Sequence, residues 1–124
     1  MCFIPRNKNS IRLKIARKNI TCYKIVNKSE LSEKIVFSTI YNYEYRIGYI
    51  YETTCGIRKS DVTEQNIVVE SGFHSFKHKP DSQFILCKDE VIVKCTIPKG
   101  SIYAKSKNFY VSSHIVINEI IPKY

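Results

Sequence analysis

The chain has 124 residues, of which 44% are hydrophobic and 25% are charged, so it can form one folded domain around a single core. This length excludes enzymes that are built on large nucleotide-binding folds or barrels. The uncharged apolar runs are far shorter than the roughly 20 residues of a membrane-spanning helix, and six basic residues interrupt the first 20 residues, where a secretory signal would be apolar. We therefore expect a cytoplasmic protein that does not enter a membrane.

The positive charge is concentrated at the N-terminus. The formal net charge is +9, and residues 1–29 hold eight basic residues and no acidic one. Residues 30–124 hold twelve basic and eleven acidic residues, so they are nearly neutral. This asymmetry predicts a basic N-terminal strand or arm at residues 1–19 and a β-rich core at residues 20–124, which together form one structural domain.

The chain is rich in residues that favour strands, among them 19 Ile and 9 Tyr. The alternation within Ile11–Ile15 predicts a strand with one basic face, and Thr21–Val26 predicts a second strand. The polar segment Asn27–Lys34 predicts a loop with one short helical turn. Alternating tyrosines within Val36–Ile50 predict further strands, with a turn or bulge at Gly48.

The second half of the chain is also rich in short apolar segments. We expect a loop at Thr53–Gln65 and a short strand at Asn66–Glu70. A capping Asp or Ser before Gln83–Cys87 predicts a short helix. Glu90–Ile97 is the clearest strand because its apolar residues alternate, and the near-continuous apolar run Val111–Ile121 predicts a buried central strand. A turn and a short strand lie between these two: Pro98–Gly100 and Ile102–Ala104.

Together these elements predict a mainly β to α+β fold. We expect a single compact domain of seven or eight short, mostly antiparallel strands, with one or two short helices. Six residues from the two longest apolar patterns are predicted to lie in the core: Val91, Val93, Cys95, Ile97, Ile115 and Ile117.

The basic N-terminal segment is the first candidate binding region. A segment of one charge sign attracts anions, so it can contact an acidic protein surface or the phosphates of a nucleic acid. The alternative is an edge strand whose lysines prevent edge-to-edge aggregation. The candidate residues are Arg6, Lys8, Arg12, Lys14, Arg17 and Lys18.

The tyrosine-rich segment is the second candidate binding region. Tyr41, Tyr43 and Tyr45 alternate beside Arg46. Tyrosines in such a row stack on bases in single-strand binders, or they anchor protein interfaces. The alternative is a sheet face on which each ring packs and each hydroxyl stays in water.

The sequence contains no recognisable catalytic or metal-binding set. Its five cysteines include no CxxC pair, and their odd number favours reduced thiols. There is no GxSxG, no GxGxxG and no Walker loop. Only His74 and His78 have the close spacing of metal ligands. We therefore expect no metal, no cofactor and a protein that is not an enzyme.

Four motifs carry a resemblance to a protein family: CYKIV at Cys22–Val26, GFHSF at Gly72–Phe76, CTIPKGSIY at Cys95–Tyr103 and YVSSHIVI at Tyr110–Ile117. Their order resembles that in a family of small uncharacterised proteins from phages and mobile elements of gut bacteria. The resemblance covers residues 20–121, and it implies an accessory role in a phage or prophage.

A fainter resemblance is to ADP-ribosyltransferase-type folds, in which an arginine, a serine and two glutamates surround nicotinamide. By this resemblance Lys24 stands at the arginine position, Ser75 at the serine position, and Ser112 and His114 at the glutamate positions. Three of the four positions depart from the family pattern. The resemblance implies an alternative nucleotide site made of these four residues and His74.

From these observations we expect a non-enzymatic phage or mobile-element accessory protein that binds a host or phage macromolecule. Inhibition of a host defence system is one form that this role could take. The alternative is a degenerate or atypical ADP-ribosyltransferase-like enzyme, or an NAD-related nucleotide-binding protein. The expected partner is an acidic protein surface or a nucleic acid, and the sequence leaves the oligomeric state open.

Overall fold

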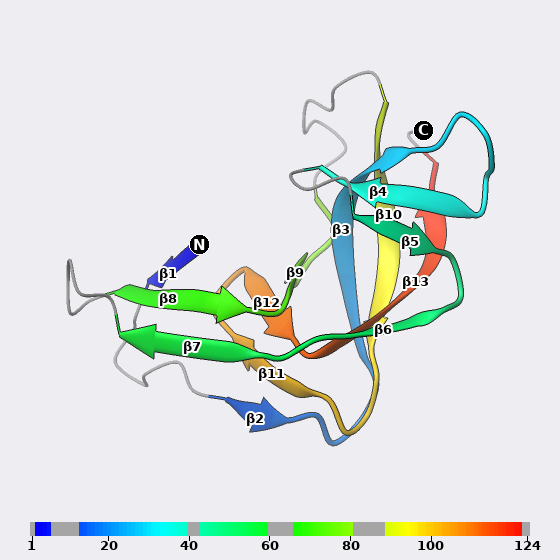
Figure 1. Cartoon of the computed structure of the whole chain (residues 1–124). Coiled ribbons are helices and arrows are strands. Elements are labelled where there is room, and N and C mark those ends of the chain that lie inside the picture. The colour runs from blue at the N-terminus through cyan, green and yellow to red at the C-terminus, as the bar shows by residue number, and fades with distance from the viewer. Residues whose placement is uncertain (1, 6–12, 40–42, 60–65, 81–88, 123–124) are drawn as a thin grey trace.

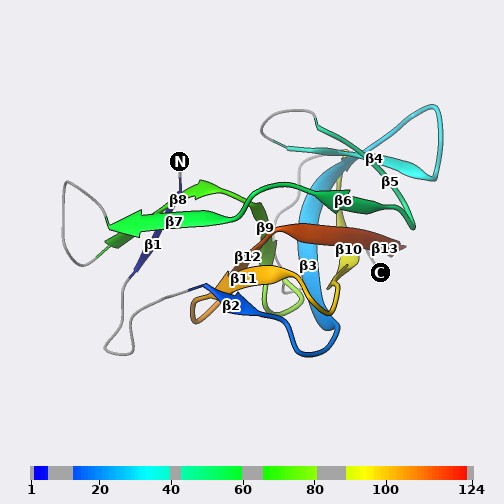
Figure 2. The ribbon, with the colours of Figure 1, turned by 60° about the horizontal axis from the view of Figure 1, so that its bottom comes forward.

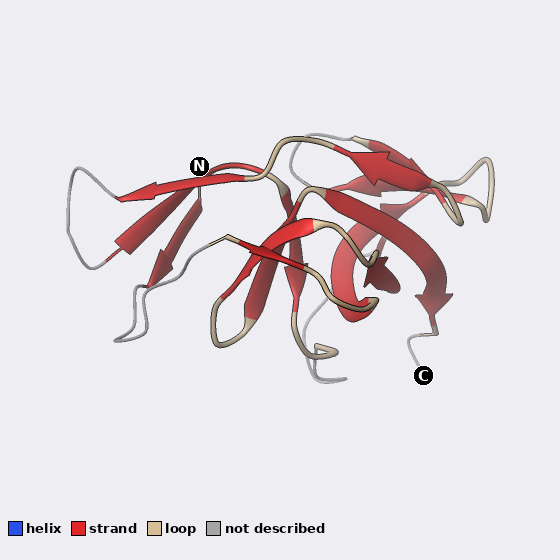
Figure 3. Ribbon diagram, turned by 90° about the horizontal axis from the view of Figure 1, so that it is seen from below, coloured by secondary structure: helices blue, strands red, loops and turns tan. Residues whose placement is uncertain are grey.

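The computed structural model describes residues 2–5, 13–39, 43–59, 66–80 and 89–122. Within these ranges the chain forms strands and loops and contains no helix (Figure 3). The described strands are β1 Cys2–Pro5, β2 Lys14–Ile15, β3 Ile20–Lys28, β4 Ile35–Ser38, β5 Glu44–Arg46, β6 Ile50–Glu52, β7 Gly56–Lys59, β8 Asn66–Ser71, β9 Phe73–Phe76, β10 Glu90–Ile97, β11 Ile102–Lys105, β12 Phe109–Ser112 and β13 His114–Ile121.

The strands form two antiparallel sheets. The larger sheet has ten strands in the order β2-β11-β12-β9-β3-β10-β13-β6, with β4 paired to β3 and β5 paired to β4. The smaller sheet has the order β1-β8-β7 and extends to one side of the larger one (Figures 1 and 2). The mainly β prediction for a single compact domain is therefore confirmed, but the described residues form thirteen strands where seven or eight were expected, and they form no helix.

The core lies along the long central strands of the larger sheet. β10 pairs with β3 from Glu90–Asn27 to Ile97–Ile20, and it pairs with β13 on its other side. Because side chains alternate between the two faces of a strand, every second residue of β10 points into the core. All six predicted core residues, Val91, Val93, Cys95, Ile97, Ile115 and Ile117, are buried.

Gly72 joins the two sheets, since it lies between β8 of the smaller sheet and β9 of the larger one. Its φ of 131° lies in a region that residues with a Cβ rarely adopt. A Cβ at this position would lie 2.4 Å from the Cγ2 atom of Val111 on β12. The passage from one sheet to the other therefore requires glycine.

Three of the predicted elements differ in the structure. Residues 27–34 contain no helical turn: β3 continues to Lys28, and the Ser29 and Ser32 hydroxyls then accept hydrogen bonds from N–H groups two residues ahead. The predicted loop at 53–65 contains β7, which pairs with β8. The predicted strand at 111–121 is two strands that break at Ser113, where the backbone N–H donates to the Ile102 carbonyl instead.

Two other predictions concern segments that the structure covers only in part. The predicted helix at Gln83–Cys87 lies outside the described residues. Of the predicted basic arm at 1–19, β1 belongs to the smaller sheet and β2 to the larger one. The described part of the arm is thus built into both sheets.

Candidate functional site

β2 forms one end of the larger sheet, and backbone hydrogen bonds attach it firmly to the turn before β11. The Ala16 N–H donates to the Ser101 carbonyl, and the Gly100 N–H donates to the Ala16 carbonyl, both at 2.8 Å. The Lys99 N–H also donates to Oδ1 of Asn19 at 2.9 Å. These contacts bring the end of the N-terminal segment next to the turn at residues 98–101 (Figure 2).

Positive and apolar side chains share this end of the sheet. Lys14, Arg17, Lys18 and Lys99 are all exposed. Ile15 and Ile102, which face each other across β2 and β11, are 69% and 42% exposed, and Leu13 is exposed as well. We call these seven residues the β2 edge surface; its members are Leu13, Lys14, Ile15, Arg17, Lys18, Lys99 and Ile102.

The β2 edge surface contains no acidic residue. Ser113 bonds both to Ile102 and to Thr53, so the backbone hydrogen bonds connect this surface to the residue after Glu52. Glu52 is already contacted by Nε2 of His114, 3.3 Å from its Oε2. Among the described residues no acidic side chain forms an ion pair with the four cations of the edge, which therefore present a positive field to an approaching partner.

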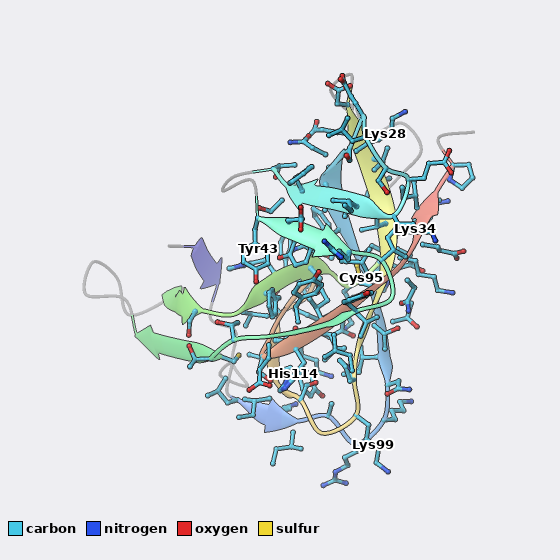
Figure 4. The ribbon with its side chains drawn as sticks, turned by 45° about the vertical axis from the view of Figure 1, so that its right-hand side comes forward. Lys28, Lys34, Tyr43, Cys95, Lys99 and His114 are labelled. Atoms are coloured by element: carbon cyan, nitrogen blue, oxygen red, sulfur yellow. The ribbon has the colours of Figure 1, made fainter. Side chains whose placement is uncertain are left out.

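The opposite end of β3 and β10 carries acidic as well as basic side chains. Lys28 and Lys34 lie at that end in Figure 4, far from Lys99. They line a shallow groove of about 990 Å³ together with four carboxylates. Leu31 projects there with 98% of its surface exposed. The lining residues are Lys28, Ser29, Glu30, Leu31, Ser32, Glu33, Lys34, Ile47, Asp89, Asn118, Glu119 and Ile120.

The described tyrosines of the second candidate region pack on one another. Tyr45 is only 4% exposed, and its ring centroid lies 5.0 Å from that of Tyr43 and 5.2 Å from that of Tyr51. The Arg46 N–H donates to the Tyr51 hydroxyl at 2.6 Å. Tyr43 remains half exposed, so a partner would meet its ring and not that of Tyr45.

The remaining members of both candidate regions are placed as follows. Arg46 is exposed, and its Nε lies 3.8 Å from Oε2 of Glu44. Tyr41 lies outside the described residues, as do three members of the basic segment: Arg6, Lys8 and Arg12.

A polar cluster lies inside the larger sheet. Cys22 on β3 and Cys95 on β10 are directly opposite each other and fully buried. A hydrogen bond with Cys95 lowers the pKa of Cys22, and the same contact, together with burial, raises the pKa of Cys95. Figure 4 shows Cys95 in the middle of the molecule. Both thiols are thus part of the packed interior.

Lys24 adds a cation to this cluster, because it shares the inward face of β3 with Cys22. Its ammonium group donates to the His74 carbonyl and lies 5.9 Å from the centre of the Tyr45 ring. Burial lowers the pKa of Lys24, since a charge is less stable away from water. Burial also raises the pKa of Tyr45.

The alternative nucleotide site is only partly assembled. Lys24, His74 and Ser75 come together from the adjacent strands β3 and β9, and the buried Ser75 hydroxyl has no hydrogen-bond partner among the described residues. The Ser112 hydroxyl on β12 is also buried, and it donates to the His114 carbonyl. The His114 ring instead contacts Ser113 and Glu52.

The sequence did not indicate that Lys99, Leu13, Ile15 or Ile102 belong to a surface. Lys99 joins the basic segment through contacts between residues about 80 positions apart, for which the sequence has no signal. The alternation in Ile11–Ile15 does indicate that the apolar residues share one face of a strand. Alternation alone does not show that Leu13 and Ile15 on that face are exposed to solvent.

No protein-family model, no curated protein and no solved structure matches the chain. In the described part of the chain, no helix could span a membrane. No group of three or more His, Cys, Asp or Glu side chains that could hold a metal ion occurs there either. The geometry of the β2 edge surface and of the interior cluster is therefore the basis for a functional assignment.

Proposed function

We propose that the chain is a non-enzymatic binding protein whose β2 edge surface docks an acidic surface of another protein. One observation supports the proposal above all: four exposed cations and three exposed apolar side chains lie together at the edge of the larger sheet. Protein interfaces commonly combine an apolar centre with a polar rim.

The apolar centre favours a protein partner over a nucleic acid. Phosphates bind to cations and polar groups, and the apolar residues would gain little from them. An acidic protein surface with apolar residues would satisfy both components of the β2 edge surface. Burial of Ile15 and Ile102 would then add affinity, while the cations would speed association and orient the partner.

The resemblance to phage and mobile-element proteins supplies a biological setting for this proposal. A small basic protein that binds an acidic host protein in the bacterial cytoplasm could block that protein, for example one that belongs to a defence system. Binding alone would be sufficient for this role, so it needs no catalytic group.

The test compares two triple charge reversals that change the net charge equally. The first variant is K14E/R17E/K18E on the β2 edge surface. The control is K28E/K34E/K94E, whose three lysines are also exposed but lie outside that surface. The probes are a glutamate–tyrosine copolymer, polyglutamate and a single-stranded oligonucleotide, each followed by fluorescence anisotropy at several salt concentrations.

We expect the edge variant to bind the copolymer about 100-fold more weakly than the natural chain, because each reversed charge replaces attraction with repulsion. We expect the control variant to change the affinity less than about threefold. Equal losses in both variants would show that only net charge matters. Tighter binding of the oligonucleotide, with a steep salt dependence, would replace the proposal with a nucleic-acid partner.

Nucleotide binding at Lys24 is a second candidate function. The observation in its favour is that the Lys24 ammonium group donates to the His74 carbonyl, next to the buried Ser75 hydroxyl, which has no hydrogen-bond partner among the described residues. A thermal-shift screen with NAD, ADP-ribose and cyclic nucleotides would test it, because a ligand that binds the native state stabilises it. A shift of several degrees that disappears in S75A would support this candidate, and no shift with any of these ligands would reject it.

A further inference from the structure

Some of the backbone N–H and C=O groups of β2 point away from the larger sheet. Both backbone groups of Ala16 face the turn before β11, as the two bonds to Ser101 and Gly100 show. Successive residues of an antiparallel strand direct their N–H and C=O groups to opposite sides. The backbone groups of Ile15 must therefore face the outer side of β2.

The bonds of Ile102 confirm this register independently. Its N–H donates to the Ser113 hydroxyl at 3.0 Å, and its carbonyl accepts from the Ser113 N–H at 2.8 Å. Ile102 thus turns its backbone away from β2, so Ile102 and Ile15 form a pair without mutual backbone hydrogen bonds. No described residue pairs with the outer side of β2.

We propose that the partner docks as an extended acidic segment that adds a strand to the outer side of β2. This inference rests on the proposed function and specifies how the same surface binds. An added strand would bond to the backbone of Ile15, and its side chains would alternate between the two faces of the sheet.

The side chains of β2 select the sequence of such a segment. Ile15 lies on one face of β2 with Ile102, and Lys14 lies on the other face. A segment in which acidic and apolar residues alternate would put its apolar side chains beside Ile15 and its carboxylates beside Lys14. Arg17, Lys18 and Lys99 would attract the carboxylates that extend past the end of β2.

The probe for this inference is a capped seven-residue peptide of alternating Glu and Val, and the control peptide has the same composition in two blocks. The informative variant is I15P, because proline removes the outward N–H and adds a ring at that point, while proline on the outer side of an edge strand is compatible with the fold. The matched variant is I15T, which keeps the N–H and a β-branched side chain.

We expect I15P to weaken binding of the alternating peptide by about tenfold or more, and I15T to weaken it less than about threefold. The block peptide should bind the natural chain more weakly than the alternating one. Amide hydrogen exchange on the natural chain gives a second measurement that requires no variant. The added strand should slow exchange of the Ile15 amide by about tenfold or more.

The outcomes separate this inference from the proposed function. Equal binding by I15P and I15T, or unchanged exchange at Ile15 in the bound state, would overturn strand addition. The proposed function would survive that result if K14E/R17E/K18E still lost binding. Failure of the alternating peptide to bind at all would overturn strand addition alone, and failure of that triple variant to reduce binding would overturn both.

Discussion

The interior of the larger sheet and the β2 edge surface use the same residue types in opposite ways. Ile117 is fully buried between strands, whereas Ile102 is 42% exposed beside β2. Burial lowers the pKa of the Lys24 ammonium group, whereas Lys14 is exposed. The comparison shows that residue type alone does not distinguish a residue that stabilises the fold from one that is available to a partner. The neighbours of each residue make the difference.

Glycine gives the largest expected contrast between the two regions. Gly72 and Gly100 both have positive φ values, 131° and 91°. Alanine at Gly72 would collide with the Val111 side chain, but at Gly100 it meets no atom within 4 Å. We expect G72A to lower the free energy of unfolding by about 3–5 kcal/mol, and G100A by about 1 kcal/mol, in urea unfolding. Equal losses of unfolding free energy in G72A and G100A would mean that backbone strain alone explains the destabilisation of both variants.

Isoleucine gives the second contrast. I117A would leave a cavity in the core, and we expect it to lower the free energy of unfolding by about 2–4 kcal/mol. We expect I102A to cost less than about 1 kcal/mol, because water already reaches much of that side chain. Denaturant unfolding of both variants tests this difference. A cost for I102A similar to that for I117A would show that Ile102 supports the fold and is not reserved for binding.

These two contrasts were only partly predictable from the sequence. The burial of Ile117 and Cys95 follows from alternation in long apolar strands. The alternation of side chains along β3 could also have predicted that Lys24 points inward, because Lys24 shares a face with the buried residues Cys22 and Val26. The requirement for glycine at position 72 depends on Val111, which approaches it only in the folded chain.

The candidate site was less predictable than the core. The charge asymmetry identified Lys14, Arg17 and Lys18, which the structure shows to be exposed. Their grouping with Lys99 and Ile102 depends on long-range pairing between β2 and β11. Local patterns determine the face on which a side chain lies, but they do not determine which distant strand lies beside it.

Lysine gives the third contrast, and it depends on pH. The lowered pKa of Lys24 means that the unfolded chain binds more protons than the folded one at pH values between that lowered pKa and the ordinary value of 10.5. Stability should therefore rise as the pH rises towards 10.5. We expect K24M to raise the free energy of unfolding by about 1 kcal/mol at neutral pH, and this advantage should shrink as the pH rises.

The control for the lysine contrast is K14M, which we expect to change stability by less than about 0.5 kcal/mol at neutral pH. Urea unfolding at several pH values checks both variants. Marked destabilisation by K24M at every pH would show that the bond from Lys24 to the His74 carbonyl outweighs the cost of burying the charge.

Tyr45 should affect stability only at alkaline pH. Its raised pKa means that the unfolded tyrosine loses its proton first, above pH 10.0. The stability that it contributes is complete below that pH and is lost above it. We expect natural chain and Y45F to diverge by about 1 kcal/mol between about pH 9 and pH 11. Parallel pH profiles in urea unfolding would contradict the assigned burial of the hydroxyl.

The most direct test of the β2 edge surface is an NMR titration of the natural chain with the alternating Glu–Val peptide. The amide signals of Leu13, Ile15, Lys99 and Ile102 should shift together and saturate at one peptide concentration. The amides of Ser29–Lys34, at the groove on the opposite end of the molecule, should remain unchanged. Shifts concentrated at Ser29–Lys34, with none along β2, would contradict the account.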